Sequence, residues 1–264
     1  MSAVEKWASA LAEWAIPQHI LDQAPTSPYR HDTTTFVVDD TLDRSVLSAE
    51  VARSVLPKSG GSVLDVGCGG GRAAMSLVPP AERVIGVDES ADMLAAFTDA
   101  ASRFGARSMT IQGRWPDVAD DAPVADVVTC HHVAYNVADI EPFVRALTEH
   151  ARLAVVLVMP TVHPRSAWSG AWRHFWDLDR PTTPTSDDFA DVLRELGLEA
   201  ERWEMPRPPL ARNAEDPATR LPAAQRVLCL GDDRADDIAA FLAHNEPAWS
   251  TVHTVFRWPG DSGR

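Results

Sequence analysis

The sequence predicts an α/β fold: one doubly wound, mostly parallel sheet with helices on both faces. Two observations lead to this prediction. Between residues 62 and 159, short apolar runs alternate with segments of helical character. Continuous apolar strands that alternate with helices are typical of a parallel sheet buried on both faces. A glycine-rich turn, "GCGGG" at 67–71, also follows the first run, at the carboxyl edge where such sheets bind ligands.

The alternating region supplies most of the predicted sheet. Its five predicted strands are 62–67, 83–88, 107–113, 125–130 and 153–159. The helices predicted between them are 71–78, 90–104 and 139–152. Pro79 and Pro80 end the first of these helices, and Asp139 caps the third. Ser90 is a side-chain cap for the second helix, which stops at Gly105.

Helical decorations are expected on either side of this region. Trp7, Leu11 and Trp14 lie at helical spacing within 3–15, which predicts an amphipathic helix. The remaining elements predicted in the flanks are helices at 42–56, 187–196, 221–229 and 233–243, an aromatic helical segment at 163–181, and strands at 198–205 and 251–258. We therefore expect a single domain over 1–264.

Composition limits the possible partners. The formal charge is −14, and no cluster of Lys and Arg interrupts the acidic surface, so nucleic acid is not an expected partner. The longest apolar run, 153–160, is far shorter than the ~20 residues that a membrane-spanning helix needs. No leader pattern is visible at the N-terminus, and the cysteines Cys68, Cys130 and Cys229 are isolated. We expect a cytoplasmic protein without a membrane partner or a structural zinc site.

The glycine turn and one acid point to an adenosine-containing ligand. Glycines let the backbone approach a ligand closely. Asp88 ends the second strand, 21 residues after Gly67, where a carboxylate accepts hydrogen bonds from ribose hydroxyls. A dinucleotide fingerprint fails because Arg72 stands where its third glycine is required, and no Gly-Lys-Ser/Thr of a P-loop is present. Asp65 beside the loop suits a ligand with an ammonium or sulfonium charge.

At these residues the chain resembles the class I S-adenosylmethionine-dependent methyltransferases. The segments in that family's order are "VLDVGCGGGR", "VIGVDES", "IQGRWPD" and "DVVTCHHVAYNV". The resemblance implies a seven-stranded Rossmann-like sheet whose last strand, 251–258, is antiparallel. It also implies S-adenosylmethionine as cofactor and S-adenosylhomocysteine as product. Residues 1–58 would form an N-terminal helical lid, 59–160 the cofactor-binding core, and 161–264 the aromatic insert and the C-terminal part of the sheet.

The resemblance also implies a set of cofactor contacts. Gly67 and Gly69 would border the methionine and ribose, and Asp65 would orient the loop near the methionine amine. The full set is Asp65, Gly67, Cys68, Gly69, Asp88, Glu89, Met93, Gly113, Arg114, Trp115 and His131. Arg114 stands where the family often has an acid for the adenine amine, so a backbone carbonyl or Asp117 would take that role. As plain alternatives, Asp65 is only a turn acid and Asp88 only a helix cap.

Residues after strand four would face the transferred methyl group. His131, His132 and Tyr135 are the catalytic candidates, because a histidine accepts a proton near neutral pH. The alternative is that one histidine only packs and the other contacts the cofactor through its backbone. No metal is expected, because no further ligand at metal-site spacing accompanies this histidine pair. The segment also lacks the Pro-Pro-aromatic signature of DNA-amine methyltransferases.

Aromatic residues of the flanks are candidates for the acceptor pocket. They are Trp14, Tyr29, His163, Trp168, Trp172 and Trp176. Aromatic walls suit a flat or apolar small molecule, although a tryptophan face that packs on the sheet would give the same pattern. We therefore expect methyl transfer to an O or N atom of a small molecule. The alternatives are a catalytically silent S-adenosylmethionine-binding or scaffold protein of the same fold and, less favoured, a nicotinamide-dependent oxidoreductase. No oligomeric state is predicted.

Overall fold

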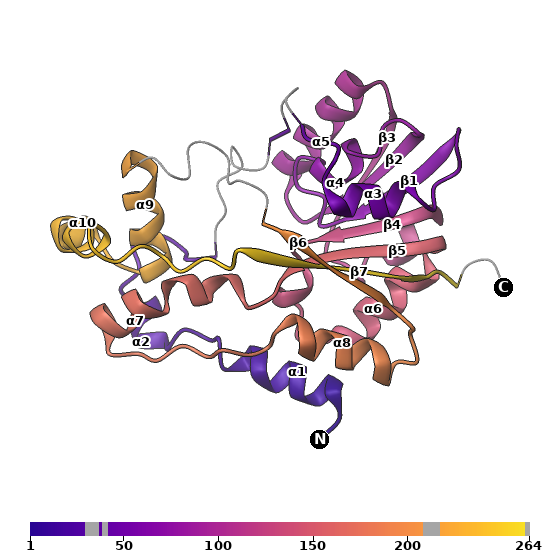
Figure 1. Ribbon diagram of the computed structural model, residues 1–264. Coiled ribbons are helices and arrows are strands. Elements are labelled where there is room, and N and C mark those ends of the chain that lie inside the picture. The colour runs from indigo at the N-terminus through magenta and orange to yellow at the C-terminus, as the bar shows by residue number, and fades with distance from the viewer. Residues whose placement is uncertain (30–36, 39–41, 208–216, 262–264) are drawn as a thin grey trace.

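A seven-stranded sheet forms the centre of the computed structural model, which describes residues 1–29, 37–38, 42–207 and 217–261 (Figure 1). The strand order is β3-β2-β1-β4-β5-β7-β6. The strands are β1 (Gly61–Val66), β2 (Ala81–Asp88), β3 (Arg107–Gln112), β4 (Ala125–His131), β5 (Ala151–Pro160), β6 (Glu201–Pro206) and β7 (Val252–Pro259). This confirms the predicted α/β class.

The strand pairing places the ends of β1 and β4 side by side. β1 pairs in parallel with both β2 and β4, so the strand order reverses between them. At such a switch point the connections leave on opposite faces of the sheet, and ligands bind in the crevice between them. β7 runs antiparallel to β5 and β6, as the family resemblance implied for 251–258.

Helices cover both faces of the sheet. One face carries α3 (Leu47–Arg53), α4 (Arg72–Met75) and α5 (Ala91–Phe104); the other carries α1 (Ala3–Ala12), α6 (Ile140–Glu149) and α8 (Ser186–Glu195) (Figure 1). Each face has its own apolar cluster, around Phe97 of α5 and Phe143 of α6, both fully buried. Because helices cover both faces of the sheet, the strands bury side chains on both sides, which explains their continuous apolar sequence.

Helix α5 begins and ends where the sequence predicts. The Ser90 hydroxyl accepts a hydrogen bond from the Met93 N–H at 3.3 Å, which satisfies one of the free donors of the first turn. Gly105 follows the last turn with φ 78°, a left-handed conformation that favours glycine. The helix is therefore bounded by its own sequence.

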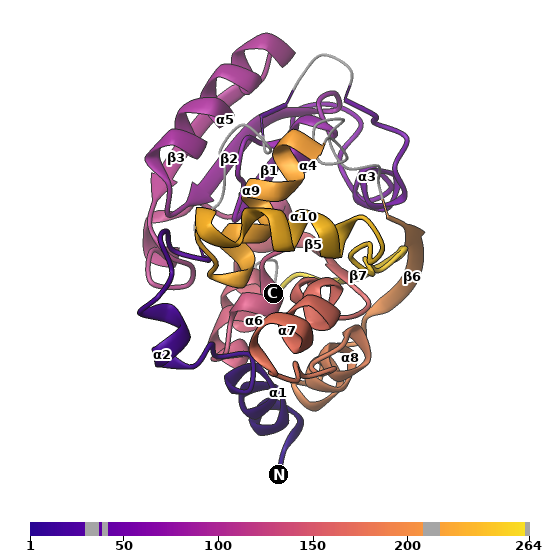
Figure 2. The same ribbon diagram turned by 90° about the vertical axis from the view of Figure 1, so that its left-hand side faces the viewer.

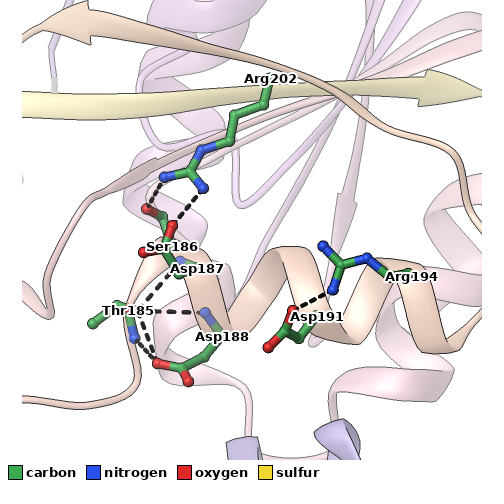
Figure 3. Close-up of polar contacts among 7 residues, drawn as sticks. All are labelled: Thr185, Ser186, Asp187, Asp188, Asp191, Arg194 and Arg202. Atoms are coloured by element: carbon green, nitrogen blue, oxygen red, sulfur yellow. Dashed lines mark hydrogen bonds and ion pairs between the residues drawn. The ribbon is translucent and has the colours of Figure 1, made fainter.

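A capping box fixes the start of α8 (Figure 3). The Thr185 hydroxyl accepts hydrogen bonds from the Asp187 and Asp188 N–H groups, and the Asp188 carboxylate accepts one from the Thr185 N–H at 2.7 Å. Arg202 of β6 then holds the first turn through Ser186 Oγ at 3.0 Å and through the Asp187 carboxylate. The helix is thereby joined to the edge strand of the sheet.

Further helices form a cap beyond the carboxyl edge of the parallel strands (Figures 1 and 2). The cap comprises α2 (Gln18–Leu21), α7 (Ser169–Trp176), α9 (Pro217–Leu228) and α10 (Ala235–Leu242). Its members share a separate apolar cluster that includes Trp168 and Trp172. The aromatic helix α7 therefore packs against the other cap helices, and not onto the sheet as one expectation had it.

The described helices of the N-terminal segment 1–58 lie in three separate places. Helix α1 packs against α8, and the buried Trp7 indole donates a hydrogen bond to the Val137 carbonyl at 2.8 Å. Helix α2 belongs to the cap, while α3 lies on the opposite face of the sheet and is shorter than the predicted 42–56. Within the described part of the chain, no helix is both long and apolar enough to cross a membrane.

Candidate functional site

The glycine loop at 67–71 turns sharply between β1 and α4. Gly67, Gly69 and Gly71 all have positive φ, at 68°, 49° and 93°. The Gly67 and Cys68 N–H groups both donate to the Val87 carbonyl, at 2.8 and 3.0 Å. A Cβ on Gly67 would lie 2.3 Å from Cγ2 of Val133. The loop therefore needs glycine, both for its conformation and because the segment after β4 approaches it closely.

Asp88 joins the end of β2 to this loop. One carboxylate oxygen accepts a hydrogen bond from the Gly69 N–H at 2.9 Å, and the other accepts one from the Ser90 N–H at 2.9 Å. An ionised carboxylate has about four acceptor positions, so two remain on this half-buried group. The structure thus brings together the two features that predicted an adenosine ligand. The ribose contact itself stays a prediction.

Asp65 lies beneath the loop and is almost completely buried. Its two oxygens accept hydrogen bonds from the Thr129 hydroxyl at 2.8 Å and the Ala74 N–H at 3.2 Å. Burial raises the pKa of the carboxyl to about 7, because these two hydrogen bonds only partly compensate the loss of water. Asp65 therefore ties α4 and β4 to β1, and its predicted contact with a methionine amine remains untested.

The predicted adenine side of the site contains an exposed ion pair. The Arg114 guanidinium lies 3.9 Å from the Glu89 carboxylate, measured from Nε. Gly113, which precedes Arg114, has φ 157° and donates its N–H to the Asp88 carbonyl at 3.0 Å. A Cβ at Gly113 would meet Val118 Cγ1 at 2.2 Å. This segment is therefore held against the end of β2, beside Asp88.

Three other predicted cofactor residues have buried side chains: Cys68, Met93 and Trp115. Burial raises the pKa of the Cys68 thiol, so the thiolate is disfavoured. The Trp115 ring packs edge-on against His150, with 5.0 Å between the ring centroids, inside the apolar cluster of α6. The Trp115 side chain is therefore a core group.

Three histidines converge at the carboxyl edge of β4 and β5. His131 ends β4, His132 follows in a left-handed conformation with φ 63°, and the His132 N–H donates to the Val158 carbonyl at 2.8 Å. The His253 ring of β7 meets that of His132, with 4.8 Å between the centroids. The sequence did not indicate His253, because only the antiparallel pairing of His253 with Pro160 brings it to this edge.

These imidazoles are neutral at physiological pH. His132 is an exposed residue, but desolvation by nearby protein atoms and then neighbouring positive charge lower the pKa of its ring to about 3. Burial lowers the pKa of His131 and of His253 to about 4. Within the described residues, Nε2 of His131 and Nδ1 of His253 are buried without a hydrogen-bond partner. Unpaired buried nitrogens are uncommon in proteins and need an explanation.

An aromatic stack leads from this edge into the cap. The rings of Tyr135 and His163 pack edge to face, with 5.6 Å between their centroids. The His163 ring stacks on Trp14, with 4.0 Å between the centroids and an interplanar angle of 18°. The Arg180 guanidinium lies 5.2 Å from the ring centroids of both Trp14 and Trp172. Of the predicted pocket residues, Trp14 and His163 thus lie beside the catalytic candidate Tyr135.

The other predicted pocket residues are parts of the cap. The Trp176 indole donates to the Leu228 carbonyl at 2.7 Å, and Trp168 packs against Trp249 with 6.1 Å between centroids. Tyr29 is exposed, with the Arg165 guanidinium 4.6 Å from its ring. No set of three or more His, Cys, Asp or Glu side chains in the described ranges is arranged to hold a metal ion.

Comparisons with known proteins agree on one family. Residues 63–154 match the family described as "Methyltransferase domain". The chain is 36% identical over 123 residues to the carboxy-S-adenosyl-L-methionine synthase of Wolinella succinogenes, which covers 42% of this chain and 49% of that protein. It is 30% identical over 112 residues to the ubiquinone biosynthesis O-methyltransferase of Azorhizobium caulinodans, covering 42% and 44%. The matches thus span about half the length of these relatives.

Solved structures share the fold. The YcgJ protein of Bacillus subtilis superposes with a TM-score of 0.53 at 17% identity, covering 81% of this chain and 97% of that one. The sheet order, the glycine loop with Asp88 and the matched domain all agree with the resemblance noted in the sequence. Over residues 63–154 the chain is therefore similar to methyltransferase domains, in agreement with its resemblance to the class I S-adenosylmethionine-dependent methyltransferases.

Proposed function

We propose that this protein transfers a methyl group from S-adenosylmethionine to an O or N atom of a small-molecule acceptor. The observation that supports this most strongly is the hydrogen bond by which Asp88, at the end of β2, accepts the Gly69 N–H of the glycine loop. It sets a carboxylate with free acceptor positions beside a turn built from glycines with positive φ. Such a pair fits the ribose and the amino-acid end of the cofactor.

The residues at the loop fit the cofactor in charge as well. Asp88 is a half-buried acid beside the loop, which suits the positive charge of S-adenosylmethionine. Asp65 is almost completely buried, and its role there is to hold the loop, α4 and β4 together. Gly67 and Gly69 keep accessible surface although their neighbours Cys68 and Gly70 are buried. We assign the methionine part to Gly67 and Gly69, the ribose to Asp88, and the adenine to the side of Glu89.

The bound cofactor would supply an electrophilic methyl group, whose carbon–sulfur bond breaks as the acceptor bond forms and the sulfur keeps the electron pair. The protein's task is to align the acceptor and exclude water, and such positioning contributes up to ~7–11 kcal/mol in well-oriented systems. A neutral acceptor loses one proton in this reaction. His132 is uncharged at physiological pH, so its ring nitrogen has a lone pair, but a pKa of about 3 makes it a weak base that can only pass that proton on to water.

Calorimetric titration tests the proposal. We expect S-adenosylhomocysteine to bind with micromolar affinity and NAD not to bind. Asp88→Ala should weaken this binding by about 10- to 100-fold, since a hydrogen bond to a charged group contributes ~1.5–3 kcal/mol. Asp92→Ala is the matched control, because Asp92 is an exposed acid in the first turn of α5.

The outcomes separate the alternatives. Equal affinity of Asp88→Ala and the wild type would refute the ribose assignment. Binding of NAD in place of S-adenosylhomocysteine would favour the oxidoreductase alternative. Transfer of a labelled methyl group from S-adenosylmethionine to small molecules in a cell extract then distinguishes an enzyme from a silent binding protein.

A further inference from the structure

Two arginines beside the aromatic stack have no carboxylate partner among the described residues. They are Arg165, in the turn Pro164–Trp168, and Arg180, after α7. Some described arginines form ion pairs, such as Arg173 with Asp179 at 2.7 Å, and others, such as Arg53, donate to backbone carbonyls. What distinguishes Arg165 and Arg180 is that both adjoin the same stack of aromatic rings.

Arg180 is held rigidly by its surroundings. Its guanidinium lies between the rings of Trp14 and Trp172. One Nη donates to the Trp14 carbonyl at 2.5 Å and the other to the Ala15 carbonyl at 3.4 Å. The Nε atom is buried and has no hydrogen-bond partner within the described residues. Leaving a donor of a charged group unpaired is costly, so this nitrogen is poised for an anionic acceptor of hydrogen bonds.

Arg165 brings a second positive charge to the same place. Its backbone N–H donates to Nδ1 of His163 at 3.2 Å, and its guanidinium covers the Tyr29 ring at 4.6 Å. Burial and then the charge of Arg165 lower the pKa of Arg180. The geometry agrees, because Arg165 adjoins His163, His163 stacks on Trp14, and the Arg180 guanidinium lies over Trp14. An anion between the two guanidinium groups would relieve their mutual repulsion.

The pair lies on the acceptor side of the site. His163, which contacts Arg165, also packs against Tyr135, a few residues after the end of β4. The half-buried acid Asp88 is instead at the glycine loop. The two positive charges therefore lie where the acceptor would enter, and the Asp88 carboxylate lies where the sulfonium cofactor would be held.

We propose that Arg165 and Arg180 bind a carboxylate of the methyl acceptor, so that the substrate is a small organic acid. This proposal rests on the function proposed above. A planar carboxylate has two oxygens, which match the fork of a guanidinium. Because both Nη groups of Arg180 already donate to carbonyls, the remaining donors suit two oxygens better than the three of a phosphate. The exposed ring of Tyr29 offers a wall for the organic part.

The test compares matched ligands on protein saturated with S-adenosylhomocysteine. Benzoate, its neutral analogue benzamide and inorganic phosphate are titrated by calorimetry and thermal shift. We expect benzoate to bind at least about ten-fold more tightly than benzamide. Arg165→Gln and Arg180→Gln should each reduce this preference to below about two-fold while S-adenosylhomocysteine still binds. Arg173→Gln is the control, because Arg173 is exposed and paired with Asp179.

The outcomes keep the two proposals apart. If S-adenosylhomocysteine does not bind to the wild type, the proposed function fails whatever benzoate does. If it binds but benzoate shows no preference over benzamide, or Arg165→Gln keeps that preference, the carboxylate site is refuted. Tighter binding of phosphate than of benzoate also refutes it. Arg180→Gln also removes contacts to the Trp14 and Ala15 carbonyls. Arg165→Gln keeps the backbone hydrogen bond to His163, so it decides the result if Arg180→Gln unfolds.

Discussion

The Thr129 hydroxyl of β4 donates a hydrogen bond of 2.8 Å to the Asp65 carboxyl of β1 inside the core. The other Asp65 oxygen accepts the Ala74 N–H of α4. Burial raises the pKa of Asp65 from 3.8 to about 7, so the neutral acid is a major form near neutral pH. In that form one oxygen donates to the Thr129 hydroxyl while the other still accepts from Ala74, because only the hydroxyl can reverse its role.

Asp65→Asn should therefore gain stability relative to the wild type as pH rises. The asparagine amide repeats the hydrogen bonds of the neutral acid. Between about pH 4 and 7 the folded wild type binds more protons than the unfolded chain, so its free energy of unfolding falls as pH increases. We expect the variant to gain a few kcal/mol at most, since one pKa unit corresponds to ~1.4 kcal/mol.

Urea denaturation at several pH values measures this difference. The gain in the free energy of unfolding of Asp65→Asn over the wild type should be absent below about pH 4 and constant above about pH 8. Asp126→Asn is a suitable contrast, because the hydrogen bonds and charge around Asp126 lower the pKa of its carboxyl despite partial burial. A stability difference for Asp65→Asn that does not change with pH would contradict the raised pKa.

Gly67→Ala should destabilise the protein through both strain and collision. The residue has φ 68°, and the new methyl would lie 2.3 Å from Val133 Cγ2. We expect a loss of about 2–4 kcal/mol. Gly60→Ala is the control, because its φ is 73° but no atom lies within 4 Å of the added Cβ. Urea denaturation should also show that Val133→Ala recovers part of the loss in Gly67→Ala. No recovery would mean that strain alone is responsible.

The imidazoles of the site should stay neutral in mildly acidic solution. The pKa is lowered, mainly by desolvation, to about 4 in His131 and His253 and to about 3 in His132 and His163. These histidines protonate in the unfolded chain near their ordinary pKa of ~6.5. Folding stability should therefore fall as pH drops below about 6.5. NMR titration of the imidazole ring-carbon signals measures these pKa values. A titration midpoint above about 6 for His132 would refute the lowered pKa of that residue.

Trp7→Phe distinguishes a packed α1 from a mobile lid. The substitution removes a fully buried indole N–H and leaves the Val137 carbonyl without its partner. We expect a loss of about 1–3 kcal/mol in the free energy of global unfolding. Trp249→Phe, at a partly exposed tryptophan, should change stability by less than about 0.5 kcal/mol. If Trp7→Phe changed stability as little as Trp249→Phe, α1 would not be a fixed part of the helical layer that it forms with α6 and α8.

Local signals made the sheet core predictable. The ends of α5 follow from Ser90 and Gly105, whose cap and left-handed conformation are properties of adjacent residues. The strands from β1 to β5 follow from apolar runs that need burial on both faces. The approach of Asp88 to the glycine loop was also predictable, because parallel strands end at one edge. The seven-strand count came from the family resemblance, with the antiparallel β7 as its last member.

Features that depend on distant pairing were not predictable. His253 reaches His132 only because β7 inserts between β5 and β6. The tryptophans of α7 have the same helical spacing whether they face the sheet or the cap, so spacing alone did not decide between these two surfaces. The contact of Arg180 with Trp14 joins residues far apart in the chain. Sequence patterns carry no direct information on such contacts.

The cap and the sheet have separate apolar clusters, with no buried residue in common. Additivity of mutational effects holds for sites that share no partners. Residues of the cap's apolar cluster can therefore change in size without disturbing the packing around the glycine loop. For the proposed methyltransferase, such a division would let the acceptor site diverge while the binding of the methyl donor is inherited intact.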